Sequence, residues 1–258
     1  MTVGQLDELQ SRLFPGSPGM RGTRKDQKKQ GSSGSPHSQH GTRQPVSGAI
    51  QSLYLNLLMI RVPAKFLISA HSPAQFPAPS VPEVAFLGRS NVGKSSLLNA
   101  LLGSKQAKVS ATPGRTRSIN FFSVTDTPQR QQPLMYFADL PGYGYAKISK
   151  SISAEWPKFI EPYLAERPTL ALCLCLVDSN IPPQASDAQL IEFLKSTGRR
   201  LIVVATKADK LSGNGRTKAQ TALRNGLEVD ELLLCSAKTG AGLKELWGAI
   251  QEAAAGPA

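Results

Sequence analysis

Cysteine is scarce in this sequence, and no apolar run approaches the length of a membrane span. The three cysteines, Cys173, Cys175 and Cys235, lie in short apolar runs with no C-x-x-C pair or histidine cluster beside them. This pattern argues against a zinc site and predicts small core residues in a reducing compartment. Because a membrane-spanning helix needs about 20 consecutive apolar residues, we expect no membrane span. The first residues also lack an apolar segment followed by a small-residue cleavage site, which argues against secretion.

Acidic residues are in the minority. The 258 residues include 30 Lys and Arg but only 18 Asp and Glu, which gives a formal net charge of +12. Residues 1–62 carry 8 basic and 3 acidic residues, and residues 63–258 carry 22 and 15, so the excess is not confined to one tail. A polyanionic partner such as RNA would explain this charge. An ordinary solvated surface is the alternative.

The first 62 residues differ in composition from the rest of the chain. Residues 15–48 are rich in Gly, Ser, Pro, Gln and basic residues and have almost no large apolar side chains. Such a segment cannot bury enough apolar surface to offset its ordering entropy, so we predict that residues 1–62 are a disordered basic extension. It could be a solvated tail or an arm that touches RNA. The abrupt change in composition nearby suggests a further hypothesis, that native translation starts at Met59.

From residue 63 onward, short apolar runs alternate with amphipathic segments. The apolar runs predict six strands: 84–87, 118–124, 134–140, 170–177, 201–205 and 232–235. The amphipathic segments predict five helices: 96–102, 153–167, 186–195, 216–225 and 243–253. A turn-rich link makes a hairpin of the second and third strands. We therefore expect an α/β fold of three layers, with a mostly parallel six-stranded sheet, one antiparallel edge strand and helices on both faces.

One stretch matches the spacing G-x-x-x-x-G-K-[ST] of a phosphate-binding loop: Gly88-Arg89-Ser90-Asn91-Val92-Gly93-Lys94-Ser95. It follows a predicted strand and precedes a predicted helix, which is the context that the motif requires. Gly88 and Gly93 allow the backbone to bend tightly and to bring its N–H groups close to phosphate oxygens. The helix N-terminus adds partial positive charge. The Lys94 ammonium would bind the β- and γ-phosphates, and the Ser95 hydroxyl would be a ligand of Mg²⁺.

Three further motifs follow later strands, at the sheet edge where such folds bind ligands. The first, Asp139-Leu140-Pro141-Gly142, offers a carboxylate to Mg²⁺ and the Gly142 N–H to a γ-phosphate. The second, Thr206-Lys207-Ala208-Asp209, offers a carboxylate that can accept two hydrogen bonds from guanine but not from adenine. Its Thr206 replaces the usual Asn and, being smaller, is expected to hold the loop less firmly. The third, Ser236-Ala237-Lys238, would direct the Ala237 N–H to the guanine oxygen.

Together these motifs resemble those of the EngB (YihA/YsxC) family of translation-factor-like P-loop GTPases, which have a Ras-like fold. The resemblance covers about residues 63–252 and also rests on Thr112-Pro113-Gly114-Arg115-Thr116, Asn120-Phe121-Phe122 and Tyr143-Gly144-Tyr145-Ala146. It implies that residues 63–258 are an EngB-type GTP-binding domain in which Ser95, Thr116 and Asp139 hold Mg²⁺. The nucleotide-binding set then gains the following residues: Gly114, Arg115, Thr116, Arg117 and Ser118.

The resemblance implies a bacterial cytoplasmic enzyme that hydrolyses GTP and associates with the large ribosomal subunit during its assembly. The family is also linked to cell division and septation. We therefore expect a large-subunit precursor or its rRNA as the partner, GTP or GDP with Mg²⁺ as bound groups, no DNA partner and a monomer. One alternative is a non-catalytic scaffold that holds GTP in septation, against which Ser95, Thr116 and Asp139 argue. Another is an ATP-dependent enzyme, against which Asp209 and Ala237 argue.

Tyr143 follows Gly142 at the position where Ras-like enzymes have a Gln that orients water. We therefore predict slow intrinsic hydrolysis, in which Lys94 and Thr116 help to neutralise the charge of the transferring phosphate. Related GTPases coordinate a potassium ion at the position of Asn91, which gives the hypothesis that K⁺ supplies charge during hydrolysis here. The alternative is that the Asn91 side chain only shapes the loop.

Overall fold

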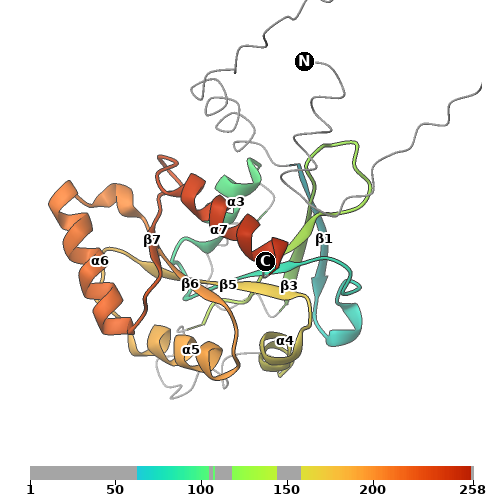
Figure 1. Cartoon of the computed structure of the whole chain (residues 1–258), viewed down its shortest axis with the longest axis horizontal. Coiled ribbons are helices and arrows are strands. Elements are labelled where there is room, and N and C mark those ends of the chain that lie inside the picture. The colour runs from blue at the N-terminus through green and yellow to red at the C-terminus, as the bar shows by residue number, and fades with distance from the viewer. Residues whose placement is uncertain (1–62, 105–106, 108–117, 144–157, 257–258) are drawn as a thin grey trace, which may run out of the picture. The chain divides into compact units, whose positions relative to one another are not determined.

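The computed structural model describes residues 63–104, 107, 118–143 and 158–256 (Figure 1). The extension predicted for residues 1–62, with the hypothetical start at Met59, lies outside these residues. The expected site residues Gly114, Arg115, Thr116 and Arg117 also lie outside them.

In the described part of the chain, one sheet of seven strands has the order β1-β3-β4-β2-β5-β6-β7. The strands have the following bounds: Ala64–Ala70 (β1), Glu83–Gly88 (β2), Ile119–Val124 (β3), Met135–Asp139 (β4), Leu170–Asp178 (β5), Leu201–Thr206 (β6) and Leu232–Leu234 (β7). The strands β4, β2, β5, β6 and β7 pair in parallel, whereas β3 is antiparallel to both β4 and β1. The predicted α/β class and the hairpin of β3 and β4 are confirmed.

The sheet has one strand more than the six that we expected. The additional strand, β1, pairs with the outer side of β3, so the antiparallel region at this edge contains two strands. The register of β1 shifts between Phe66 and Ile68, and both Phe66 and Leu67 are exposed. Because this irregularity breaks the alternation of buried and exposed residues, the sequence of β1 lacks the two-residue period by which a half-buried strand is recognised.

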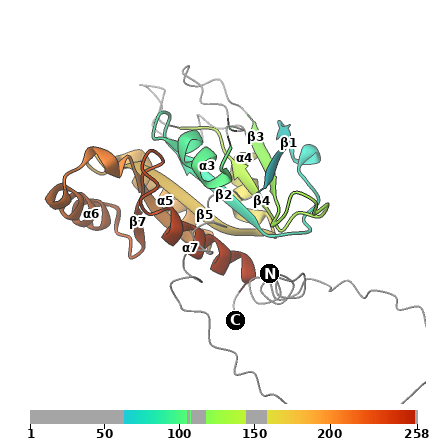
Figure 2. The ribbon, with the colours of Figure 1, turned by 90° about the horizontal axis from the view of Figure 1, so that it is seen from above.

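Helices cover both faces of the sheet (Figures 1 and 2). One face packs against α3 (Lys94–Leu102) and α7 (Leu243–Ala255). The other packs against α4 (Ile160–Glu166), α5 (Ala185–Ser196) and α6 (Gly213–Leu227). The three cysteines are buried in these two cores, as predicted. No helix within the described ranges combines the length and apolarity that crossing a bilayer requires.

Helix α4 occupies only the second half of the predicted segment 153–167. It begins at Ile160, and residues 144–157, which include Pro157, lie outside the described residues. Pro162 is therefore the third residue of the helix, where its missing N–H removes no intrahelical bond. Ile160, Tyr163 and Leu164 are buried on one side of the helix, as the apolar stripe predicted.

A buried carboxylate marks the amino end of β2, far along the strand from the phosphate-loop motif. Glu83 has 0% exposed surface. Its carboxylate accepts hydrogen bonds from the Tyr163 hydroxyl at 2.8 Å, the Arg167 Nε at 2.9 Å and the Thr169 hydroxyl at 2.7 Å. Burial, followed by the nearby Glu83 charge, raises the pKa of Tyr163 well above its usual value. This group, which we call the Glu83 cluster, joins β2 to α4 and to the start of β5.

Replacing Glu83 by Gln should lower the free energy of unfolding by about 3 kcal/mol, because it leaves the Arg167 guanidinium, whose side chain is only 11% exposed, without its counter-charge. Urea denaturation monitored by circular dichroism measures this change. Glu252→Gln is the matched control, since it breaks the Arg200–Glu252 pair, whose side chains are 40% and 73% exposed. That control should change stability by less than about 0.5 kcal/mol. Equal effects of the two substitutions would contradict the prediction.

Candidate nucleotide-binding site

The carboxyl ends of the parallel strands meet at one edge of the sheet, and the predicted motifs follow them there. Strand pairing places Phe86 of β2 beside Asp139 of β4, and Asp178 of β5 beside Thr206 of β6. The loop after β2 therefore lies beside the segments that follow β4 and β6. Motifs separated by more than 100 residues in the sequence are brought to one place.

The backbone of the loop between β2 and α3 explains both of its glycines. A Cβ atom on Gly88 would lie 2.8 Å from Cγ1 of Val92 and 2.9 Å from the carbonyl oxygen of Leu176. Gly93 has a φ of +107° and Asn91 a φ of +64°, both in the left-handed region. Helix α3 then begins at Lys94. The N–H groups of a first helical turn have no helical acceptor, so they are available to an anion.

Four successive residues of this loop are held by polar contacts from other parts of the chain, which we call the loop contacts. They are Arg89 Nε to the Asp187 carboxylate at 3.1 Å, Ser90 N to Tyr143 O at 3.0 Å, Asn91 O to Lys207 Nζ at 2.9 Å, and Val92 O to Thr206 Oγ1 at 2.6 Å. The partners come from α5, from the segment after β4 and from the end of β6. The loop is therefore positioned by three separate elements.

Lys94 and Asp139 form an ion pair at the centre of the site. The Lys94 ammonium donates a hydrogen bond to the Asp139 carboxylate, and the side chains are 12% and 8% exposed. Ser95 is the next residue of α3 and is half-buried. An ammonium, a carboxylate and a hydroxyl thus come from the N-terminus of α3 and the end of β4. These are the groups expected to bind a phosphate and a divalent cation.

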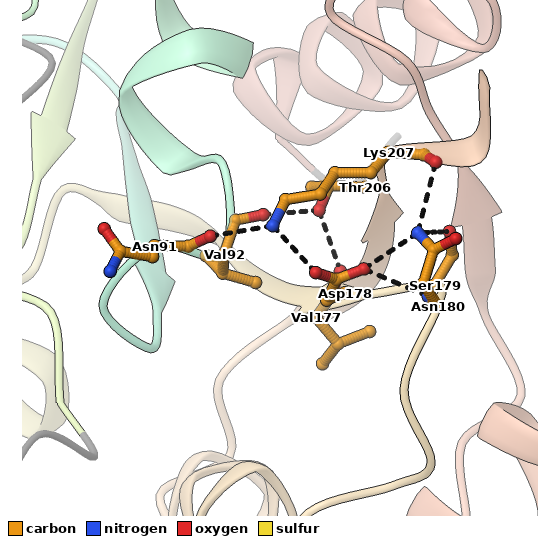
Figure 3. A network of polar contacts seen from close by, with 8 residues as sticks. All are labelled: Asn91, Val92, Val177, Asp178, Ser179, Asn180, Thr206 and Lys207. Atoms are coloured by element: carbon orange, nitrogen blue, oxygen red, sulfur yellow. Dashed lines mark hydrogen bonds and ion pairs between the residues drawn. The ribbon is translucent and has the colours of Figure 1, made fainter. Parts of the chain in front are cut away.

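Lys207 is held by a polar network that Figure 3 shows. Its ammonium lies 2.7 Å from Oδ2 of Asp178, whose Oδ1 accepts hydrogen bonds from the backbone and side-chain N–H groups of Asn180, both at 3.0 Å. Partial burial raises the pKa of Asp178, but the hydrogen bonds from Lys207 and Asn180 outweigh it and lower the pKa below its usual value. No motif in the sequence pointed to Asp178. Its position at the end of a predicted buried strand was the one feature of the sequence that could have indicated a site residue.

The short Thr206 side chain contacts two backbone carbonyls, one in the phosphate loop and one in β5. Its Oγ1 lies 2.6 Å from the carbonyl oxygen of Val92 and 3.1 Å from that of Val177 (Figure 3). The residue is 4% exposed, so these contacts are shielded from water. The short side chain suffices because β6 lies directly beside β5 and close to the loop. The expectation that Thr206 holds the loop less firmly than Asn would stays a prediction.

The segment after β7 supports Asp209. The Ser236 hydroxyl donates a hydrogen bond of 2.6 Å to Asp209, and this bond lowers the pKa of that carboxyl below its usual value. The N–H of Ala208 donates to the carbonyl of Cys235 at 3.1 Å. Ala237 is half-buried and Lys238 is exposed beside them. The two predicted base-recognition motifs are thus joined to each other.

A second acidic residue that the sequence analysis did not identify is Asp187 of α5, which is 2% exposed. Besides Arg89, it accepts a hydrogen bond of 3.0 Å from the hydroxyl of Tyr143. Burial raises the pKa of Asp187, although Arg89 and Tyr143 act in the opposite direction. Burial also raises the pKa of Tyr143, and the nearby Asp187 charge adds to this effect. We call this group the Asp187 cluster. Its only sequence signal was an acid in the first turn of an amphipathic helix.

The structure therefore brings most of the expected residues together. The loop 88–95, the segment 139–142, the motif 206–209 and the residues 236–238 all follow strand ends at one edge of the sheet. Ser118 is buried directly before β3. The expected residues 114–117 lie outside the described part of the chain.

Known proteins are similar to this chain in sequence and in fold. A family model described as "50S ribosome-binding GTPase" matches residues 83–207. A "probable GTP-binding protein EngB" from Acidobacterium capsulatum is 74% identical over 196 residues, which are 76% of this chain and 93% of that protein. A crystal structure of a probable EngB protein aligns with a TM-score of 0.52 and 24% identity over 66% of this chain and 97% of that one.

A crystal structure of Era in complex with MgGDPNP and nucleotides 1506–1542 of 16S ribosomal RNA also aligns. The TM-score is 0.53 and the identity 29%, over 67% of this chain and 56% of that one. These alignments show that the sheet and its helices have the P-loop GTPase fold. Since most of the EngB relative is matched at high identity, the chain belongs to the EngB family of GTP-binding proteins, a family of GTPases.

Proposed function

We propose that this protein is a Mg²⁺-dependent GTPase whose GTP and GDP states act as a switch in assembly of the large ribosomal subunit. We also propose that it works in the cytoplasm and is required for normal septation. One observation carries the proposal: the phosphate-loop motif and an ionised Asp209 lie at the same edge of the sheet in an EngB-family chain. Residues 63–258 would be the GTP-binding domain, and residues 1–62 an extension.

The chain offers complementary charge to a triphosphate. The N–H groups of residues 88–95 and the N-terminus of α3 would face the phosphate oxygens. Lys94 would move its hydrogen bonds from Asp139 to the β- and γ-phosphates. Gly142 would donate its N–H to the γ-phosphate, which only GTP has. These contacts bind the charge that grows during phosphoryl transfer.

The donor atoms around Lys94 fit a magnesium ion. The Ser95 hydroxyl and the Asp139 carboxylate are hard oxygen donors of the kind that Mg²⁺ prefers together with phosphate oxygens and water. Within the described residues, no three His, Cys, Asp or Glu side chains gather into a metal site of their own. We therefore propose that Ser95 and Asp139, with Thr116, hold Mg²⁺ alongside the nucleotide. A Mg²⁺ ion held there would neutralise negative charge on the phosphates of the nucleotide.

Base recognition would depend on Asp209 and the groups that position it. The Ser236 bond favours the ionised form of the carboxyl and orients it, and carboxylate oxygens can accept hydrogen bonds from guanine. The Lys207 stem, fixed by Asp178, would lie along the base, and the Ala237 N–H would meet the guanine oxygen. Leaving these polar groups unpaired against adenine would be costly.

Slow intrinsic hydrolysis follows from the position of Tyr143. Its hydroxyl bonds to Asp187 and its side chain is buried, so it does not offer the group with which a Gln would orient water. Asn91 is exposed at the loop surface, and we propose that it coordinates K⁺ near the transferring phosphate. The cation would supply part of the missing charge stabilisation.

The ribosomal partner is supported by charge and by relatives. Residues 63–258 carry 22 basic and 15 acidic residues, which favours a polyanion. The family model that matches residues 83–207 is described as ribosome-binding, and the Era structure contains a fragment of ribosomal RNA. We therefore propose a precursor of the large subunit, or its rRNA, as the partner of a monomeric protein.

Asp209→Asn should weaken GTP binding by about a hundredfold, because the amide presents a donor where guanine needs an acceptor. The same variant should gain affinity for xanthosine triphosphate, which has an oxygen in place of the guanine amino group. Isothermal titration calorimetry with both nucleotides measures this change of preference from guanine to xanthine. Asp230→Asn, at an exposed carboxylate after α6, is the control and should bind as the wild type does. An unchanged preference for guanine in Asp209→Asn would contradict the proposed role of Asp209.

Turnover of GTP should be faster in potassium chloride than in sodium chloride at equal ionic strength. Phosphate release under saturating GTP measures this difference. Asn91→Gly is the informative variant, because Gly accepts the φ of +64° while the amide is lost. The variant should hydrolyse GTP at equal rates in the two salts. Equal rates for the wild type would remove K⁺ from the mechanism.

The full-length protein should co-sediment with large-subunit precursors in the presence of a non-hydrolysable GTP analogue, and at least several-fold less with GDP. Purified small subunits serve as the control particle. The same binding in both nucleotide states would contradict a switch. Stable binding of GTP with no turnover on these particles would instead indicate the non-catalytic scaffold.

A further inference from the structure

Two buried clusters of the same chemistry lie at opposite ends of β2. Each contains a carboxylate that accepts hydrogen bonds from one tyrosine hydroxyl and one arginine. Glu83, at the first residue of β2, holds Tyr163 and Arg167. Asp187 holds Tyr143 and Arg89, the residue that follows β2. The Glu83 cluster joins structural elements, whereas both partners of Asp187 belong to the site.

The main chain of Tyr143 is paired with the phosphate loop. Arg89 and Tyr143 form a parallel β-bridge, in which the Ser90 N–H donates to the Tyr143 carbonyl at 3.0 Å. The preceding residue is packed equally closely, since a Cβ atom on Gly142 would lie 3.0 Å from Oγ and 3.1 Å from N of Ser90. Fixing Tyr143 therefore also fixes Gly142 against the loop.

The Asp187 cluster fixes Tyr143 from its side-chain end. Tyr143 is 1% exposed and Asp187 is 2% exposed, so neither polar group can exchange its partner for water while the segment stays in place. Leaving either group buried and unpaired is unfavourable. Breaking the hydrogen bond between them would leave a buried polar group unpaired, so this bond favours the position of the segment 140–143 against the loop.

We propose that Asp187 is a positioning residue for the γ-phosphate: through Tyr143 it holds the Gly142 N–H beside the phosphate loop, so that α5 contributes to the distinction between GTP and GDP. This inference rests on the proposed role of Gly142. GDP lacks the phosphate that Gly142 would contact, so release of the segment weakens only the binding of the triphosphate. Arg89 extends the effect of Asp187 to the loop itself.

The test compares Tyr143→Phe with Tyr163→Phe in the full-length protein. Each substitution removes one hydroxyl from one buried carboxylate and keeps the ring, so the costs in stability are similar. Dissociation constants for GDP and for a non-hydrolysable GTP analogue are measured with Mg²⁺ by calorimetry, and melting temperatures by differential scanning fluorimetry. Asp187→Asn is the second site variant. Tyr143→Phe is informative even if Asp187→Asn does not fold.

Tyr143→Phe should weaken binding of the GTP analogue relative to GDP. The ratio of the dissociation constant for the analogue to that for GDP should rise by about fivefold. Asp187→Asn should raise it by about tenfold, because it also weakens the hold on Arg89. Tyr163→Phe should lower the melting temperature and leave the ratio unchanged. The inference is overturned if Tyr143→Phe changes stability as Tyr163→Phe does and leaves the ratio at its wild-type value. A wild type that does not bind the analogue would instead overturn the proposed function.

Discussion

The site depends on how residues 89–92 of the phosphate loop are held. The loop closes one turn of its own, from Val92 N–H to Arg89 C=O at 3.2 Å, and each residue of this stretch is then fixed from outside by one of the loop contacts. Backbone with left-handed residues cannot continue a strand or a helix, so regular hydrogen bonding does not define its shape. Contacts from α5, from the segment after β4 and from the end of β6 do so instead, and a loop fixed in advance loses less entropy when it binds a ligand.

Ion pairs between different elements fix the charged groups at this edge. The cations and anions pair as follows: Arg89 with Asp187, Lys94 with Asp139, and Lys207 with Asp178. Because these side chains are mostly shielded from water, each charge needs its partner, and each pair constrains two elements at once. The Glu83 cluster at the other end of β2 uses the same chemistry for joining elements alone. The two clusters differ in location, because only the Asp187 cluster lies at the carboxyl ends of the strands, beside the proposed nucleotide site.

Contiguous motifs were the part of the site that could be predicted. The spacing of Gly88, Gly93 and Lys94 between a strand and a helix sufficed for the phosphate loop, and the hairpin and the α/β class followed from apolar periodicity. Asp178 and Asp187 could not be identified in this way, because their partners are distant in the sequence. Strand β1 was missed because its register shift removes the two-residue period. Thr206 was judged by its size, whereas its contacts depend on how closely β5 and the loop approach it.

The sequence by itself determined the order of strands and helices from β2 onward, the positions of the motifs along the chain and the kinds of groups that each motif carries. These properties are local, since periodicity, turn residues and motif spacing act over a few residues. Only the tertiary structure decided which carboxylate meets which cation, and that Tyr143 is joined to α5. Such pairings arise when parallel strands align their carboxyl ends, and they depend on distances between segments that no local pattern records.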